Sequence, residues 1–399
     1  MPAGFDLLNL PADFVPRAYD YFKAARAASP ACPNSDGSFV LTRYDDIVQV
    51  YRDPGLWSSD KQAAFKPKFG DSPLFEHHTT SLVFRDAPDH TRIRKLFQHA
   101  FTRKALAALE SRIEALVDEY LDRLEDQGGM EIVGEFSFKL PVEVVCDMLG
   151  VPAGDRILIR DWALLILGAL EPTITDRQFQ EGCRAVEDFK AYLREQMALR
   201  RRNPAARREG EILSDLMDAE EDGARLTELE LLHQCIFLLN AGHETSTNML
   251  SHGVHEFLRN PGEIRRLIDA PALIDSAVEE VLRYQAPIQI NNRRALAPAN
   301  VGGAAIPAGA TVHLMLGAAN RDPAQFPDPD RFDIARRPNR HLSFGLGVHI
   351  CAGNALARLE AKIAFQKLFD RFPGLTLAAP PVLASRIRFR EVTELKVSL

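Results

Sequence analysis

The sequence predicts one large, mainly α-helical domain that spans residues 1–399 and carries small β-sheets. Apolar residues recur at helical spacing in three long segments, 103–124, 136–149 and 178–199. Strand signals are few and short, and no linker rich in proline, glycine or serine divides the chain. A chain of 399 residues is long enough for one large domain.

The longest helix is predicted between Thr227 and Asn260. Thr227 followed by Glu230 forms a capping box, and Asn260 followed by Pro261 ends the helix. The result is a helix of about thirty residues, nearly three times the mean length. Its centre reads NAGHETST, in which Gly242 and polar residues interrupt an apolar stretch. The helix either reaches the surface briefly at this point or opens locally for a functional reason.

Three short segments have strand patterns. Residues 38–44 alternate between apolar and polar side chains, and residues 303–316 read as a hairpin around Pro307 to Gly309. Residues 288–293 follow Pro287 and also read as a strand. Alternation along that strand would place Gln289, Asn291 and Arg293 on one side.

Composition argues against several classes of protein. The net charge of -7 argues against general nucleic-acid binding, because nucleic acids are also negatively charged. The first residues lack a signal-peptide pattern and no apolar run reaches membrane-spanning length, so we expect a cytoplasmic protein without membrane insertion. We also expect it to be a monomer. The five cysteines are scattered and form no C-x-x-C pair, which argues against a disulfide framework and a structural zinc site.

One cysteine occupies an unusual position. The stretch FGLGVHICAG, residues 344–353, places Cys351 among Gly345, Gly347 and Gly353, directly before a helical pattern that begins at Asn354. The positive end of a helix favours a thiolate, and glycines let a large flat group approach the backbone. Three interpretations remain open: a tight turn around a buried cysteine, a nucleophile with His349 as a weak base, or a thiolate ligand to a haem iron.

The pattern F-G-x-G-x-H-x-C-x-G resembles the cysteine loop of the cytochromes P450, the haem-thiolate monooxygenases. Further motifs follow in the family's order from about residue 84 to residue 372. The resemblance implies the cytochrome P450 fold, with a long central helix over the haem and the cysteine loop beneath it. It also implies that Cys351 is the ligand of the iron in haem b (iron protoporphyrin IX).

The centre of the long helix resembles the family signature A-G-x-[DE]-T. The resemblance implies that Ala241 and Gly242 contact the haem. Glu244 and Thr245 would be the acid–alcohol pair that delivers protons during dioxygen cleavage. His243 is often a histidine in this pattern and is given no catalytic role.

Other positions are assigned to the cofactor by the same resemblance. His90 and Arg94 lie four residues apart on one helical face, which would otherwise read as a solvated surface. The resemblance makes both of them ligands of the haem propionates. The remaining predicted cofactor contacts are Arg293, Phe344, Gly345, His349 and Gly353.

Glu280 and Arg283 form an E-x-x-R pair on a predicted helix. Such a pair alone is a common surface ion pair. In the family, it closes a buried network with a downstream arginine behind the haem. Arg336 is the predicted third member here, and Arg337 is the alternative.

The implied function is insertion of one atom of dioxygen into a small organic substrate by hydroxylation, epoxidation or O-dealkylation. Electrons would come from NAD(P)H through a separate reductase and a ferredoxin or flavodoxin. The alternatives are a peroxide-driven peroxygenase and a haem-binding sensor without turnover; retention of Glu244 and Thr245 argues against both. Gln289 and Asn291 are predicted to contact the substrate. The electron donor is expected to dock on basic residues near the cysteine loop, namely Arg92, Lys95, Lys104, Arg336, Arg340 and Arg358.

Overall fold

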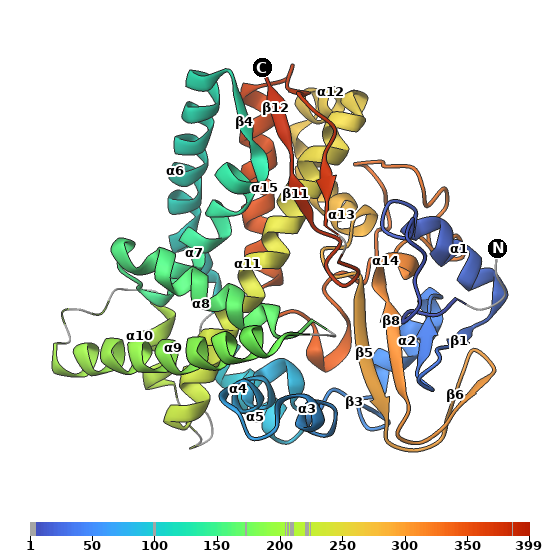
Figure 1. Cartoon of the computed structure of the whole chain (residues 1–399). Helices are drawn as coiled ribbons and strands as arrows, with labels where there is room; N and C mark the ends of the chain where they lie inside the picture. Colours follow the sequence, from blue (N-terminus) through green and yellow to red (C-terminus); the bar gives the residue numbers. More distant parts are fainter. Residues whose placement is uncertain are drawn as a thin grey trace. The chain divides into compact units, whose positions relative to one another are not determined.

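The computed structural model describes residues 5–98, 101–171, 174–203, 205, 207, 211–219, 223, 225–384 and 386–399. Helices dominate in these residues (Figure 1). Internal contacts group the chain into two compact units, each built from separate segments. The first unit comprises Met1–Ser58, Glu114–Phe138 and Thr245–Leu399, and the second comprises Ser59–Ile113 and Lys139–Glu244. None of the described helices is long and apolar enough to cross a membrane.

The first unit holds every strand of the described residues. A five-stranded sheet has the order β1-β2-β8-β5-β3, in which β2 and β8 are parallel and the other pairs are antiparallel. Three smaller sheets pair β4 with β12 and β9, β6 with β7, and β10 with β11. The bounds are β1 Ala31–Pro33, β2 Phe39–Leu41, β3 Trp57–Ser58, β4 Gly129–Glu131, β5 Ile290–Ala295, β6 Ala299–Val301, β7 Ala304–Ile306, β8 Thr311–Met315, β9 Thr376–Leu377, β10 Val382–Leu383, β11 Val392–Glu394 and β12 Lys396–Ser398.

Helices of the first unit pack around these sheets. An apolar core joins α2 to the five-stranded sheet through Ile47, Val50, Leu314 and other fully buried side chains. The helix α15 packs along α13. The bounds are α1 Ala18–Ala28, α2 Tyr44–Arg52, α12 Pro261–Asp269, α13 Ile274–Tyr284, α14 Leu316–Ala319 and α15 Asn354–Arg371.

The predicted hairpin around Pro307 to Gly309 is wrong. β7 and β8 flank this turn but do not pair with each other. β7 pairs instead with β6, through a turn at Gly302 and Gly303, which have φ angles of 57° and 89°. Two adjacent glycines with positive φ suit a tight hairpin turn, and this signal precedes the proline by a few residues.

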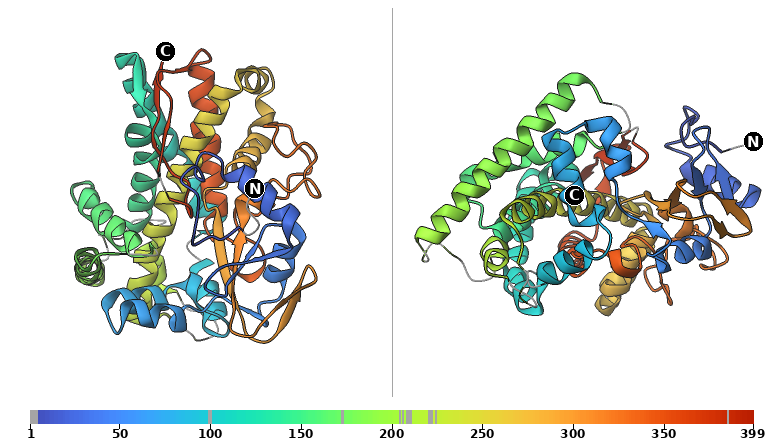
Figure 2. Two further views of the ribbon diagram at one scale, coloured as in Figure 1. Left: turned by 45° about the vertical axis from the view of Figure 1, so that its right-hand side comes forward. Right: turned by 90° about the horizontal axis from the view of Figure 1, so that it is seen from below.

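The second unit is helical, and Figure 2 shows α9 as one long rod within it. A capping box begins α9, because Thr175 Oγ1 accepts from the Gln178 amide nitrogen at 3.2 Å. The bounds are α3 Gln62–Phe69, α4 Pro73–Thr80, α5 Asp89–Gln98, α7 Lys139–Leu149, α8 Arg156–Gly168, α9 Asp176–Arg202 and α10 Ile212–Asp218.

Two helices contribute residues to both units: α6 Arg103–Gln127 and α11 Glu228–Arg259. α11 is the predicted long helix, and it has 32 residues. The predicted capping box forms: the Thr227 amide donates to Glu230 Oε2 at 2.9 Å, and the Glu230 amide donates to Thr227 Oγ1 at 3.2 Å. The helix ends at Arg259, just before the predicted stop.

A fully buried carboxylate organises the first unit around α13. Glu280 has no exposed surface, and Arg283 donates to its two oxygens at 2.7 and 2.8 Å. Arg336 Nε lies 3.2 Å from both oxygens, whereas Arg337 is exposed. Asn339 Nδ2 and the Asp333 amide donate to the same carboxylate at 3.1 and 2.9 Å. Five donors on one carboxylate satisfy a charge that could not otherwise be buried.

A second carboxyl group is buried where α15 meets α11. Glu360 is 1% exposed and its side chain is hydrogen-bonded to the Ser246 hydroxyl. No described residue bonds to its Oε2. Burial raises the pKa of Glu360 to about 8, because it penalises the charged form more than the bond with Ser246 favours it. This side chain therefore keeps its proton to a higher pH than an ordinary glutamate does.

We expect Arg336→Ala to destabilise the protein by about 3–5 kcal/mol, because Glu280 would keep a buried charge with one cation fewer. Arg337→Ala is the matched control and should change the free energy of unfolding by less than about 0.5 kcal/mol. Chemical denaturation of both variants measures the difference. Equal losses in the two variants would contradict the assignment of Arg336 to the network.

Glu360 gives the stability of the protein a defined pH dependence. Its folded-state pKa of about 8 lies above the ordinary value of 4.5, so the folded state binds this proton more tightly than the unfolded state. The stabilising effect is complete below the ordinary pKa and is lost as the pH rises towards 8. Glu360→Gln should therefore raise Tm relative to the unchanged protein at pH 8 but not at pH 5. Glu114→Gln, at an exposed position on α6, should show no such trend.

Candidate functional site

The cysteine loop precedes α15 and is closed by its own backbone. The Cys351 amide donates to the Phe344 carbonyl at 2.9 Å, and Asn354 Nδ2 donates to the Cys351 carbonyl at 2.6 Å. Cys351 is half-buried, whereas Cys32, Cys146 and Cys235 are buried. Burial raises the pKa of the Cys146 and Cys235 thiols to about 12, which makes them poor ligands. Cys351 thus combines accessibility with a position just before a helix.

Glycines in this loop meet a tyrosine that sequence reasoning missed. Gly345 and Gly347 have φ angles of 68° and 75°, which side chains rarely adopt. A Cβ atom on Gly347 would lie 2.7 Å from the Tyr51 carbonyl oxygen. The loop therefore packs directly on the C-terminal end of α2. No local pattern around Tyr51 predicts this contact, because Tyr51 and the cysteine loop lie far apart in the sequence.

Tyr51 also contacts β5 and so connects that strand with the cysteine loop. Its hydroxyl accepts from Asn291 Nδ2 at 3.2 Å, and the guanidinium of Arg293 lies 5.2 Å from the centre of its ring. Arg293 Nη1 donates to Asn291 Oδ1 at 3.3 Å. Asn291 and Arg293 therefore share one side of the strand. The buried hydroxyl of Tyr51 has a raised pKa because of its burial.

Gln289 lies one residue before β5, which begins at Ile290, so the strand starts two residues later than the pattern suggests. Its Nε2 donates to the Ala286 carbonyl at 2.7 Å, and the side chain is buried. Its Oε1 is buried and has no hydrogen-bond partner among the described residues. This oxygen would lie 1.9 Å from a Cβ atom on Gly317, so the absence of a side chain at position 317 makes room for Gln289.

The middle of α11 has an accessible face. Phe237 and Thr245 are half-buried and Ala241 is exposed, at i, i+4 and i+8, although most neighbouring residues on the helix are buried. Gly242 is half-buried, and a Cβ atom there would lie 3.0 Å from Val145 Cγ2. Glu244 is 7% exposed. The helix is not interrupted here, so the polar residues sit on an intact helix that is accessible at its centre.

The predicted propionate ligands occupy both units. His90 and Arg94 lie on α5 in the second unit, where His90 is buried and Arg94 is half-buried. Arg293 and His349 belong to the first unit, with Arg293 buried and His349 half-buried in a short 3-10 turn. Phe344 stacks against the Arg358 guanidinium at 4.5 Å, and Gly353 directly precedes α15.

The Glu280 network holds the segment that leads into the cysteine loop. Arg283 Nη1 donates to the Asn320 carbonyl at 3.0 Å. The Asn320 side chain then donates to Ser343 Oγ at 2.8 Å and accepts from the Leu342 amide at 2.7 Å. Ser343 Oγ donates to the Leu282 carbonyl at 2.6 Å. α13 therefore fixes both ends of residues 320–343, directly before Phe344.

A second carboxylate on α13 holds the far side of this region. Glu279 accepts from Arg358 at 2.6 and 3.0 Å and is bonded to His341 Nε2 at 3.1 Å. Burial would raise the pKa of Glu279, but the bonds from His341 and Arg358 lower it to about 2. Sequence reasoning missed Glu279, which differs from an ordinary surface glutamate only by its position beside Glu280.

Comparison with known proteins gives consistent results. A family model described as Cytochrome P450 matches residues 156–378. Cytochrome P450 107B1 of Saccharopolyspora erythraea is 38% identical over 87% of this chain and 85% of that protein. Vitamin D(3) 25-hydroxylase of Pseudonocardia autotrophica is 36% identical over 90% of this chain and 87% of that protein.

A solved structure extends the likeness to the whole fold. P450BioI, in a crystal structure with an acyl carrier protein that bears hexadec-9Z-enoic acid, has a TM-score of 0.90 and 33% identity. The match covers 98% of this chain and 100% of that chain. Together with the cysteine loop, this places the chain, with the cytochrome P450 fold and haem b as cofactor, in the cytochrome P450 family of monooxygenases.

Proposed function

We propose that this cytochrome P450 inserts one oxygen atom of dioxygen into an apolar organic substrate, with Cys351 as the ligand of the haem iron. The observation that carries the proposal is the half-buried thiol of Cys351 in a loop closed by its own backbone directly before α15. The haem, once bound, supplies the chemistry of dioxygen activation, and a thiolate ligand favours cleavage of the oxygen–oxygen bond.

The residues of the first unit suit a flat cofactor with an apolar body and two carboxylates. Val348 and Ile350, on either side of His349, are 50% and 40% exposed and offer an apolar surface beside the thiol. Arg293 brings a buried positive charge to Tyr51, the residue that packs against the same loop. We assign the propionates to Arg293 and His349 and, from the second unit, to His90 and Arg94.

Thr245 and Glu244 have the properties that proton delivery requires. Thr245 lies on the accessible face of α11, where its hydroxyl can donate to an oxygen atom near the helix. Glu244 is buried one residue earlier and can replace the proton through a hydrogen-bonded chain. We therefore assign Thr245 as the donor and Glu244 as its source. We keep Ala241 and Gly242, from the same stretch of α11, as contacts of the cofactor.

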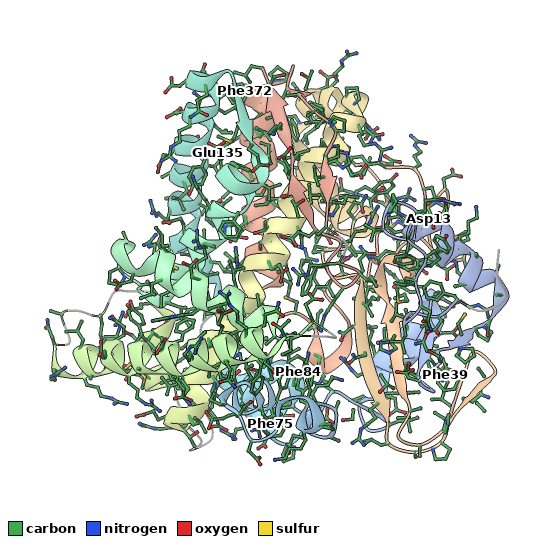
Figure 3. All side chains as sticks on the ribbon, in the orientation of Figure 1. Asp13, Phe39, Phe75, Phe84, Glu135 and Phe372 are labelled. Atoms are coloured by element: carbon green, nitrogen blue, oxygen red, sulfur yellow. The ribbon has the colours of Figure 1, made fainter. Side chains whose placement is uncertain are left out.

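The substrate is proposed to be mainly apolar. One relative is named for vitamin D(3), and P450BioI was crystallised with hexadec-9Z-enoic acid attached to an acyl carrier protein; both small molecules are mainly apolar. In the second unit, Phe65 packs against Phe69 and Phe84 with ring centres 5.5 and 5.4 Å apart; Figure 3 labels Phe84 and the nearby Phe75. These rings lie between Trp57 and Val83 or directly after this segment, which by resemblance to the family we propose as one of the segments that determine substrate specificity. Gln289 and Asn291 remain proposed polar contacts of the substrate.

Electrons are proposed to come from NAD(P)H through a reductase and a ferredoxin or flavodoxin. The predicted docking surface needs one correction, because the Arg336 side chain is 9% exposed and bound to Glu280. The adjacent Arg337 is exposed and replaces it, and Arg340, already part of the predicted surface, is exposed as well. Arg358 is engaged with Glu279 and Arg92 with Glu230, so neither is a freely available charge. The side chain of Lys104 lies outside the described residues.

We expect the purified protein to bind haem and to give the carbon monoxide spectrum of a thiolate complex. Cys351→Ser should abolish that spectrum, because an alcohol is a much weaker ligand than a thiolate. Cys183→Ser is the matched control, since Cys183 is the other half-buried cysteine, and it should leave the spectrum unchanged. A thiolate spectrum that survives Cys351→Ser would overturn the assignment.

Thr245→Ala should bind substrate as before but release more hydrogen peroxide per NAD(P)H, because the hydroxyl that delivers protons is missing. The loss of coupling should be at least about tenfold. Thr247→Ala, two residues further along the helix, provides the comparison. Product and peroxide measured in the same reaction decide the point, and equal coupling in Thr245→Ala and the unchanged enzyme would rule out the role.

A further inference from the structure

A row of buried polar side chains continues the accessible face of α11 towards its C-terminus. Asn248, His252 and Glu256 follow Thr245 at three, seven and eleven residues, which is one, two and three turns of helix. They are 0%, 2% and 1% exposed. Three polar groups in succession therefore line one buried face of the helix within the first unit.

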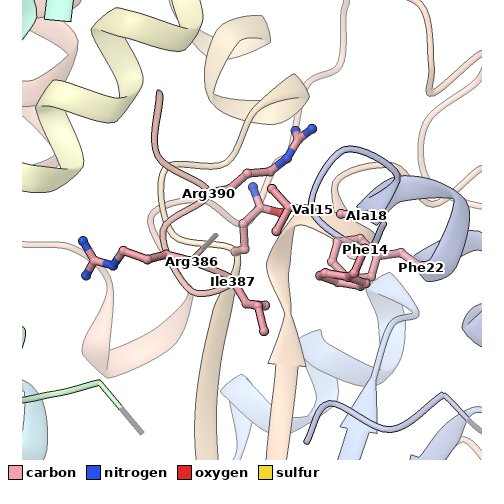
Figure 4. A pocket seen from close by; sticks show the side chains of 8 residues that line it. Phe14, Val15, Ala18, Phe22, Arg386, Ile387 and Arg390 are labelled. Carbon is pink, nitrogen blue, oxygen red and sulfur yellow. The ribbon is translucent and has the colours of Figure 1, made fainter. Parts of the chain in front are cut away.

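The chain between Arg386 and Glu391 covers this row. Asn248 Nδ2 donates to the Phe389 carbonyl at 3.4 Å, and His252 Nε2 lies 2.6 Å from the Arg390 carbonyl. Arg390 Nη1 donates to Gln285 Oε1 at 2.6 Å, and Gln285 Nε2 donates to Glu256 Oε1 at 2.6 Å. Figure 4 shows the guanidinium groups of Arg386 and Arg390 pointing to opposite sides of this segment.

Each of the three side chains in the row forms a hydrogen bond through one polar atom, either to residues 386–391 or to Gln285. A second polar atom of each side chain has no hydrogen bond among the described residues. These atoms are Asn248 Oδ1, His252 Nδ1 and Glu256 Oε2. A carbonyl can only accept, so His252 Nε2 carries the proton in its bond to Arg390. Burial lowers the pKa of His252 to about 3, so the ring is neutral and Nδ1 is an acceptor.

Three buried acceptors in a row require donors. Buried polar atoms are nearly always satisfied, and a water molecule supplies two O–H groups where no protein donor is present. The first unit also contains a small cavity, large enough for about one water molecule, whose lining includes Arg390, Gln289 and Phe14 (Figure 4). Two of its lining residues each carry a further buried atom without a partner among the described residues, Arg390 Nε and Gln289 Oε1. Room for water therefore exists beside the same cover.

The far end of the row approaches the solvent. Arg259 is 58% exposed and its Nη1 lies 3.6 Å from Glu256 Oε2, within ion-pair range but without a hydrogen bond. The side chain of His255 is 14% exposed, and its Nδ1 lies 4.0 Å from Glu256 Oε1. Charge and exposure at this end allow exchange of protons with bulk water, whereas the other end leads to Thr245.

We propose that a file of buried water molecules lies along Asn248, His252 and Glu256 and carries protons from the Arg259 end of α11 to Thr245. Each water accepts one proton and passes one on, so that one proton enters from bulk solvent for each one delivered and no other bond changes. Asn248 and His252 act as positioning residues. The inference rests on the proposed function: the file supplies Thr245 with protons from bulk solvent in addition to the proton held by Glu244. This route is also separate from the buried Glu360, which bonds to Ser246.

A high-resolution crystal structure of the holoenzyme tests the water file directly. Ordered waters are expected within hydrogen-bond distance of Asn248 Oδ1, His252 Nδ1 and Glu256 Oε2. Their absence, or protein donors in their place, would overturn the proposal. This measurement does not depend on turnover. If the protein oxidised no substrate, the proposed function would be contradicted, whereas the presence or absence of the water file would still be determined from the electron density.

The role in proton transfer is tested by His252→Phe, which keeps a ring but removes the acceptor. We expect a changed solvent isotope effect and at least about tenfold more peroxide released per product formed, with haem content and substrate affinity unchanged. His252→Gln restores an acceptor and should restore coupling. His313→Phe, on β8, is the matched control outside the row. An unchanged isotope effect and unchanged coupling in a folded His252→Phe enzyme, or no rescue by His252→Gln, would overturn the proposal.

Discussion

The carboxylate of Glu280 is the constraint on which the rest of the first unit depends. A buried carboxylate must accept several hydrogen bonds to compensate for the loss of water. Here the donors come from α13 and from residues 333–339. Satisfying one carboxylate therefore ties a long irregular segment to a helix. The same helix fixes Asn320 and Ser343, so that the cysteine loop begins from a defined point although the segment before it has little regular structure.

Much of this arrangement can be predicted from the local sequence. The capping box at Thr227, the apolar periodicity of α11 and the helix after Gly353 each follow from neighbouring residues, and the structure has them where the pattern predicts. The identity of the third member of the Glu280 network is different. Arg336 and Arg337 are adjacent and chemically equal, and only the path of the chain after Phe332 determines which of the two side chains reaches the carboxylate.

Contacts between distant segments were not predictable in this way. Tyr51 packs against Gly347 and stacks with Arg293, but nothing near position 51 signals a partner almost 300 residues away. Glu360 lies on the inner face of α15, where periodicity places apolar residues. Its raised pKa comes from burial there, and the hydrogen bond with Ser246 of another helix only partly opposes this rise. The hairpin at Pro307 failed for a related reason: β8 has better partners in β2 and β5 than in its sequence neighbour.

The contact between Gln289 and Gly317 has a consequence for attempts to redesign this protein. Any side chain at position 317 would occupy the space of the Gln289 amide. Substitutions at the two positions therefore depend on each other. A library that randomises position 289 alone samples only side chains that fit against a glycine at position 317. Introducing alanine at 317 becomes feasible once a shorter residue stands at 289. Engineering of this strand edge should accordingly treat the pair as one composite site, in which volume added at one position is removed from the other.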